Sequence, residues 1–148
     1  MTTVTAQTTQ VYQLFIRATP EAIWEAITDP AFTEQYFYGT RIETTPERRR
    51  VFAMNDPDGF GDDRILEYDP PRKLVHGWHA KWSEELAAEE ESRVTWEIEP
   101  QEDGTTLLTL IHDQLEDAPK TAASVSGVGW MRVLSGLKTL TETGTPLA

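Results

Sequence analysis

The first apolar pattern along the chain has a period of two. In the stretch "VYQLFIRA", Tyr12, Leu14 and Ile16 fall on one face, and Gln13 and Arg17 fall on the other. Alternation of this kind is typical of a β-strand with one buried face. We therefore predict that the fold opens with a strand.

Two short helices are predicted after this strand. The sequence "TPE" at 19–21 supplies an N-cap, a proline for the first helical turn and an acid near the helix N-terminus. The first helix is therefore expected over about residues 20–28. The pair "DP" at 29–30 repeats this start, and Gly39 ends the second helix.

Six further strands are predicted between the second helix and residue 113. The turn-like segment "NDPDGFGDD" (55–63) and the charged segment "SEELAAEEE" (83–91) interrupt them. Most of the other connections are short, which favours one antiparallel sheet. The predicted strands are "TRIETT" (40–45), "RRVFAM" (49–54), "RILEY" (64–68), "KLVHGWHAKW" (73–82), "SRVTWEIEP" (92–100) and "TTLLTLIHD" (105–113).

From about residue 121 the apolar period changes from two to 3.6. One stripe runs from Val125 through Trp130 to Leu140, which predicts a helix of roughly twenty residues ending at Gly144. The predicted order is β-αα-β6-α, an α+β fold of about seven strands in which the C-terminal helix covers one face of the sheet. We expect residues 1–148 to form a single domain, with a flexible lead over 1–8.

Charge narrows the choice of partners. The chain has 148 residues and a formal net charge of -12, and a surface this acidic repels nucleic acids and anionic membranes. Its only basic cluster is Arg48, Arg49 and Arg50, which we interpret as an exposed strand start paired with acids such as Glu47. Neither nucleic acid nor membrane is therefore predicted as a partner.

The absence of cysteine removes disulfides, thiolate metal sites and cysteine nucleophiles. The N-terminal residues lack the basic and apolar regions of a secretory signal, and no apolar run is long enough to span a membrane. We expect a cytoplasmic protein. No cofactor and no metal ion are predicted.

The stretch "RKLVHGWHAKW" (72–82) concentrates histidine and tryptophan. On a strand, His76 and His79 point to opposite faces, so together they cannot hold one metal ion. His76, Trp78 and Trp82 share a face whose large aromatic area predicts that it points inward. These rings either line a pocket or fill the core, and periodicity alone leaves both interpretations open.

His112 ends the last predicted strand in step with Leu108 and Leu110, so it should also face inward. His76 and His112 are the candidates for a catalytic base. No serine or cysteine nucleophile motif accompanies them, so a structural, hydrogen-bonded role is the favoured interpretation.

Four segments of the chain resemble the SRPBCC superfamily, which has the helix-grip fold of START and pollen-allergen-type proteins. Within it, the chain is most similar to the branch related to the C-terminal domain of the activator of the heat-shock-protein-90 ATPase. The segments are "IRATPEAIWEAITDPAFTEQYF" (16–37), "ILEYDPPRKLVHGW" (65–78), "SRVTWEIEPQEDGTTLLTLIHD" (92–113) and "GWMRVLSGLKTL" (129–140).

The resemblance implies a seven-stranded antiparallel sheet curved round the C-terminal helix, with a hydrophobic cavity between them. In other members this cavity receives lipids, polyketides or similar apolar molecules. Carried onto this chain, the predicted ligand-binding residues are Tyr36, Phe37, Phe52, Trp78, Trp82, Trp96, His112, Trp130 and Leu134.

The chain departs from the branch in two places. Many relatives have a histidine three residues before the Gly-Trp pair, where this chain has Ser126. The segment 41–54 also lacks the Gly-rich, Trp-containing pattern of the branch. A role that depends on that histidine does not carry over.

Three functions follow as hypotheses. The first is non-catalytic binding of a hydrophobic or aromatic small molecule, with its polar end held by His112, His76 or Tyr36. The second is an enzyme of the cyclase or dehydratase kind, with a cavity histidine as general base. The third is a co-chaperone-like domain that binds a chaperone or another protein, with the oligomeric state, a dimer included, left open.

Overall fold

The computed structural model describes residues 8–53, 56–79 and 83–148. The expected flexible lead therefore lies, apart from Thr8, outside the described residues. Seven strands form one antiparallel sheet with the order β1-β7-β6-β5-β4-β3-β2. The strands are β1 (Gln10–Ile16), β2 (Arg41–Thr44), β3 (Arg48–Ala53), β4 (Asp56–Asp69), β5 (Lys73–Trp78), β6 (Ser92–Pro100) and β7 (Thr106–Asp113).

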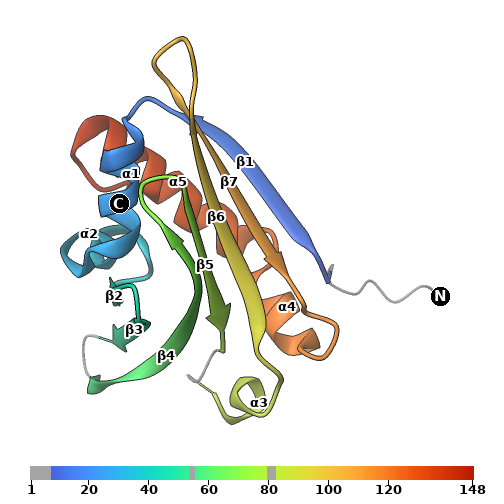
Figure 1. Ribbon diagram of the computed structural model, residues 1–148. Helices are drawn as coiled ribbons and strands as arrows, with labels where there is room; N and C mark the ends of the chain where they lie inside the picture. The colour runs from blue at the N-terminus through green and yellow to red at the C-terminus, as the bar shows by residue number, and fades with distance from the viewer. Residues whose placement is uncertain (1–7, 54–55, 80–82) are drawn as a thin grey trace.

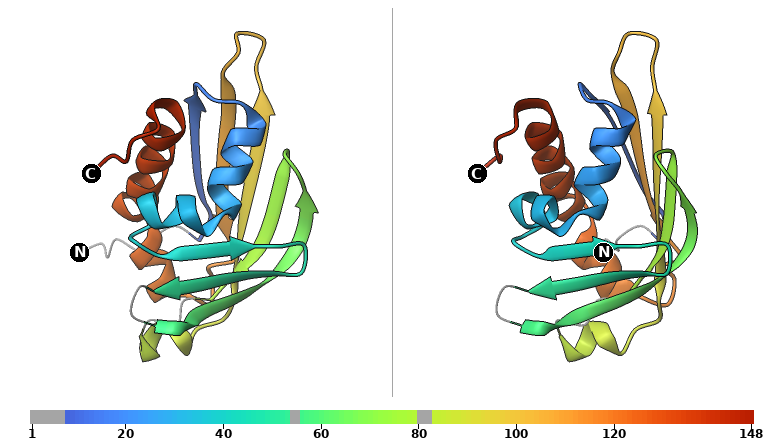
Figure 2. Two further views of the ribbon diagram at one scale, coloured as in Figure 1. Left: turned by 90° about the vertical axis from the view of Figure 1, so that its left-hand side faces the viewer. Right: turned by 60° about the vertical axis from the view of Figure 1, so that its left-hand side comes forward.

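The sheet bends strongly, and its long strands β1, β7 and β6 run beside the C-terminal helix (Figure 1). Turning the molecule shows α1, α2 and α5 together on one face of the curved sheet (Figure 2). The helices are α1 (Pro20–Thr28), α2 (Pro30–Tyr36), α3 (Glu84–Ala87), α4 (Pro119–Val125) and α5 (Val128–Thr143). The α+β prediction of a curved antiparallel sheet around a C-terminal helix is confirmed.

The start signals of α1 and α2 work as the sequence predicts. Thr19 Oγ1 accepts a hydrogen bond from the Ala22 N–H at 3.1 Å, and Asp29 Oδ1 accepts one from the Ala31 N–H at 2.8 Å. Each cap satisfies a backbone donor that has no partner inside the helix. The chain can therefore turn directly from one short helix into the next.

Two predicted boundaries were wrong. Most of the expected turn at 55–63 belongs to β4, because this segment pairs with β3 and so satisfies its backbone groups in the ladder. The C-terminal helix is also divided into α4 and α5. Its stripe is interrupted at Gly127, which has φ 57°, a left-handed conformation that glycine adopts without strain.

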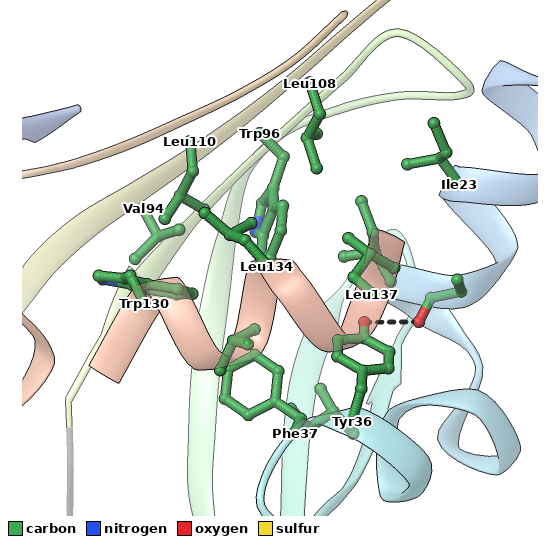
Figure 3. Close-up of a cluster of buried hydrophobic side chains, with 14 of the residues drawn as sticks. Ile23, Tyr36, Phe37, Val94, Trp96, Leu108, Leu110, Trp130, Leu134 and Leu137 are labelled. Carbon is green, nitrogen blue, oxygen red and sulfur yellow. Dashed lines mark hydrogen bonds between the residues drawn. The ribbon is translucent and has the colours of Figure 1, made fainter. Parts of the chain in front are cut away.

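The core lies between the sheet and α5, and Figure 3 shows aliphatic and aromatic side chains meeting there from both layers. α2 closes the side of this core, and Gly136 allows it to approach α5. A Cβ atom at Gly136 would lie 2.9 Å from the Tyr36 Cβ atom. The Tyr36 hydroxyl donates to the Ala26 carbonyl at 2.7 Å and so fixes α2 against α1.

Candidate functional site

A cavity of about 310 Å³ opens between the N-terminal half of α5 and strands β2 to β5. Pockets of about 300–1,000 Å³ are the usual size of small-molecule sites. Side chains from both layers form its walls. The lining residues are Phe37, Tyr38, Thr40, Ile42, Arg49, Val51, Gly61, Asp63, Trp78, His79, Ser124, Val125, Gly129, Trp130 and Val133.

Three aromatic rings form one wall of the cavity. The Trp78 ring centroid lies 5.4 Å from that of Trp130 and 6.3 Å from that of Phe37, and the Phe37 and Trp130 rings meet edge to face at 6.0 Å. These spacings are those of favourable aromatic pairs. The three rings come from α5, β5 and the end of α2, so the wall exists only in the folded chain.

An ion pair lies in the same cavity. Arg49 of β3 donates through Nη1 to Asp63 Oδ2 of β4 at 2.9 Å, and the two side chains are 4% and 5% exposed. Asp63 Oδ1 also accepts from the His79 N–H at 3.2 Å. The interpretation of the arginine cluster as an exposed strand start was therefore wrong for Arg49, because Arg49 faces inward in step with Val51.

The Arg49 guanidinium packs against two aromatic rings. Its Cζ atom lies 5.2 Å from the Trp78 ring centroid and 5.8 Å from that of Phe37, distances at which cation–π attraction operates. Burial lowers the pKa of Arg49 and raises the pKa of Asp63, and each residue opposes the shift in the other. The pair thus brings two opposite charges to an apolar cavity.

His112 stands behind the aromatic wall with both ring nitrogens engaged. The Trp130 Nε1–H donates to His112 Nδ1 at 3.1 Å. His112 Nε2 lies 2.8 Å from Ser92 Oγ, which donates to the Trp78 carbonyl at 3.2 Å. This network assigns the proton of a neutral ring to Nε2, and burial lowers the pKa of His112 to about 3.

His76 is engaged in the same way on β5, which is separated from β7 by β6. Its Nε2 accepts from the Trp96 Nε1–H at 3.0 Å, and its Nδ1 donates to the Gly77 carbonyl at 2.7 Å. Burial and the charge of Arg49 lower the pKa of His76 well below the usual value. Both histidines therefore serve as neutral acceptors that orient an indole ring.

The structure brings only part of the predicted ligand-binding set to the cavity. Phe37, Trp78 and Trp130 line it, and His112 contacts two of these rings from behind. Tyr36, Trp96 and Leu134 are buried in the core and are not among the lining residues.

Two other predicted residues are not among the lining residues. Phe52 lies on the opposite face of β3 from Arg49, where the Arg50 guanidinium covers its ring at 5.1 Å. Because alternate residues of a strand point to opposite faces, Phe52 does not point into the cavity, where it had been expected. Trp82 lies outside the described residues. Ser126, at the position where relatives have histidine, lies in the link between α4 and α5 and donates to the Ala123 carbonyl.

Sequence reasoning missed Arg49, Asp63 and His79 as lining residues. Arg49 alternates with Arg48 and Arg50, so the period of two that exposes its neighbours could have placed it inward. Asp63 was hidden in a predicted turn. His79 follows the last residue of β5, where the strict alternation of the strand no longer applies.

Among the described residues no group of three or more metal-ligating side chains comes together. Two buried side-chain polar atoms in this part of the chain have no hydrogen-bond partner, Thr44 Oγ1 and Trp78 Nε1. Of the two residues, Trp78 lines the cavity.

Comparison with known proteins identifies relatives of the whole domain. A family model described as Activator of Hsp90 ATPase homolog 1-like protein matches residues 17–142. No curated protein matches the chain.

No helix in the described residues has the length and apolar character needed to cross a membrane.

Solved structures with the same fold include three informative ones. The Aha1 dimer from Colwellia psychrerythraea is 18% identical with a TM-score of 0.70, over 93% of this chain and 98% of that one. PFC0360w, an HSP90 activator from Plasmodium falciparum, is 19% identical with a TM-score of 0.70, over 90% and 96%. DynU16, a protein in the dynemicin biosynthetic locus, is 23% identical with a TM-score of 0.71, over 95% of this chain but 49% of its own length.

Proposed function

The chain belongs to the family of Activator of Hsp90 ATPase homolog 1-like proteins, and from this premise we propose that it binds a hydrophobic or aromatic small molecule between its sheet and α5. The observation that carries the proposal is the aromatic-walled cavity of about 310 Å³. Removal of apolar ligand surface from water would supply the affinity, at roughly 25 cal/mol per Å².

The way in which the aromatic wall is fixed supports this proposal. The Trp130 indole is tied by a hydrogen bond to the buried His112, so this ring cannot rotate into the cavity without leaving a buried polar atom unpaired. An apolar space kept open by such bonds suits a flat, rigid guest. DynU16, which has the same fold, comes from a biosynthetic locus, and this favours a small molecule as the ligand.

A titration of tryptophan fluorescence with flat apolar probes such as naphthalene, together with native mass spectrometry, tests the proposal. We expect saturable quenching in the wild type and strong loss of binding in Val133→Phe, which fills the cavity. Val11→Phe is the matched control, since Val11 is 57% exposed on the outer face of β1. Equal affinity in both variants, or no saturable binding to the wild type, would contradict the proposal.

A second candidate is contact with a chaperone of the Hsp90 class. The family description and the description of PFC0360w as an HSP90 activator favour it. The test is the ATPase rate of purified Hsp90 with and without the chain. A rate increase that survives Val133→Phe would assign this activity to the surface rather than to the cavity.

Catalysis by His76 or His112 has less support. A general base needs a free nitrogen within reach of the proton that it removes. In both rings the hydrogen bonds described above use both nitrogens. We therefore assign both histidines a structural role: His112 supports the Trp130 ring of the cavity wall, and His76 supports Trp96 in the core.

A further inference from the structure

The polar residues of the cavity differ in depth. Tyr38 and Ser124 are exposed at its mouth, and Thr40 and His79 are half-buried. Arg49 and Asp63 are the charged lining side chains that the structure buries almost completely. A ligand that fills the cavity would therefore meet one strongly polar feature away from the mouth, the ion pair.

This pair is electrically balanced, and its balance restricts the charge of a guest. A third charge would enter a desolvated space in which neither Arg49 nor Asp63 is free to neutralise it. An anionic guest would in addition face the Asp63 carboxylate and a chain of net charge -12. The arrangement disfavours carboxylates such as fatty acids, and it favours guests without formal charge.

Arg49 and Asp63 also differ in how many further hydrogen bonds each can make. Both Asp63 oxygens already accept bonds, one from Arg49 and one from the His79 N–H. A guanidinium carries five N–H donors, and among the described residues the hydrogen bond of Arg49 goes to Asp63. Trp78 adds a buried indole N–H without an acceptor in the described part of the chain. Arg49 and Trp78 can therefore donate hydrogen bonds to an acceptor atom of the ligand.

The geometry points to the class of ligand. We propose that the cavity selects uncharged aromatic molecules bearing a carbonyl oxygen, which Arg49 binds while Asp63 holds the guanidinium in place and excludes carboxylates. This inference rests on the proposed function and goes beyond it by naming the group that is recognised. The aromatic body of the guest would lie against Phe37, Trp78 and Trp130.

Three probes with the same body test the selection at pH 7.5 in fluorescence titrations: naphthalene, 2-acetylnaphthalene and 2-naphthoate. We expect 2-acetylnaphthalene to bind about tenfold more tightly than 2-naphthoate and severalfold more tightly than naphthalene. Equal affinities, or preference for 2-naphthoate, would overturn the inference and leave the proposed function standing. If none of the probes binds, the proposed function itself fails.

Two variants test whether the ion pair of Arg49 and Asp63 causes the preference among the three probes. Asp63→Asn keeps the shape but removes the negative charge, so 2-naphthoate should gain well over tenfold in affinity, which reverses the preference. If this variant does not fold, the double variant Arg49→Met with Asp63→Leu replaces the pair by apolar side chains, a change that cores often tolerate. It should bind naphthalene and 2-acetylnaphthalene equally.

The chain provides a matched control in a second ion pair. Arg93 and Asp113 pair across β6 and β7 at 2.5 Å and do not line the cavity. Arg93→Met with Asp113→Leu should leave the order of the three affinities unchanged. If this control alters the preference as much as the Arg49 and Asp63 double variant does, the ion pair of the cavity is not the recognition element.

Discussion

The two ends of α5 meet the sheet in different ways. Towards its C-terminus, Leu137 and Leu140 join Ile16, Ile23 and Leu108 in a solid core of aliphatic side chains. Towards its N-terminus, Trp130 and Val133 face the cavity. We refer to these regions as the packed end and the open end, and Figure 3 shows the aliphatic residues Ile23, Leu108 and Leu137 apart from the ring of Trp130.

The difference lies in what fixes the side chains. Aliphatic groups at the packed end are held by contact alone, so they interdigitate until no space is left. At the open end, Trp130 is held by a directed hydrogen bond to His112 and Arg49 by an ion pair with Asp63. Directed bonds specify where a group lies, and the volume between such groups can therefore stay empty.

Breaking the ion pair should have the largest effect on stability. Asp63→Ala leaves the buried Arg49 charge without its partner, which typically costs about 3–5 kcal/mol. The control is Asp113→Ala, which removes a more exposed pair and should cost about 1 kcal/mol or less. Urea unfolding measures both. Equal losses would show that the open end does not depend on its buried charges.

A truncation at each end compares the packing directly. Leu137 is fully buried at the packed end, so Leu137→Ala should cost about 2–5 kcal/mol. Val133 already borders empty volume, so Val133→Ala removes fewer contacts and should cost about 1 kcal/mol. Urea denaturation of the two variants is the measurement. A larger loss for Val133→Ala would mean that the cavity closes in solution.

The hydrogen-bond network behind the wall should have an intermediate effect. Ser92→Ala removes the partner of His112 Nε2 and of the Trp78 carbonyl. Leaving such buried groups unpaired costs about 1–3 kcal/mol. Ser126→Ala is the control, because the exposed Ser126 hydroxyl bonds locally to the Ala123 carbonyl, and it should lie within about 0.5 kcal/mol of wild type. A neutral Ser92→Ala would refute the supporting role of this network.

The smallest effect should be a gradual loss of stability in mild acid. The folded protein keeps His76 and His112 neutral, with both pKa values below the 6.5 of an unfolded histidine. Below pH 6.5 the unfolded state therefore binds more protons, and the free energy of unfolding falls as pH falls. Each histidine should contribute a loss of about 1 kcal/mol between pH 6.5 and 5.5.

Unfolding midpoints in urea at pH 7.5, 6.5 and 5.5 measure this effect. His112→Gln should unfold with a shallower dependence on pH than the wild type, because one of the two buried histidines is gone. A stability that does not change between pH 7.5 and 5.5 would show that the two rings are not held neutral by the fold.

Much of the fold could be predicted because its signals are local. The caps at Thr19 and Asp29 and the alternation of Tyr12, Leu14 and Ile16 act within a few residues, and the structure has them as predicted. The failures came from pairing over long distances. The segment 55–63 has the composition of a turn, but its partner strand β3 makes most of it part of β4.

The candidate site could be predicted less well, because a cavity depends on where two layers separate. Trp78, Trp96 and Trp130 are all inward-facing aromatics in the sequence, but the register of the strands along α5 leaves two of them beside the cavity and one in solid core. Arg49 was missed for a related reason. Its charge suggests solvent exposure, and only the neighbouring strand supplies Asp63 to compensate it.

By itself the sequence determined the order of the strands, the inward faces of strands such as β1 and β7 and the acidic character of the chain, because period, capping and charge are properties of neighbouring residues. The tertiary structure alone decided that Arg49 is buried with Asp63, that His76 and His112 are neutral supports, and that the open end of α5 leaves a cavity. Each of these depends on residues far apart in the chain, whose contacts and desolvation exist only once the sheet has closed over the helix.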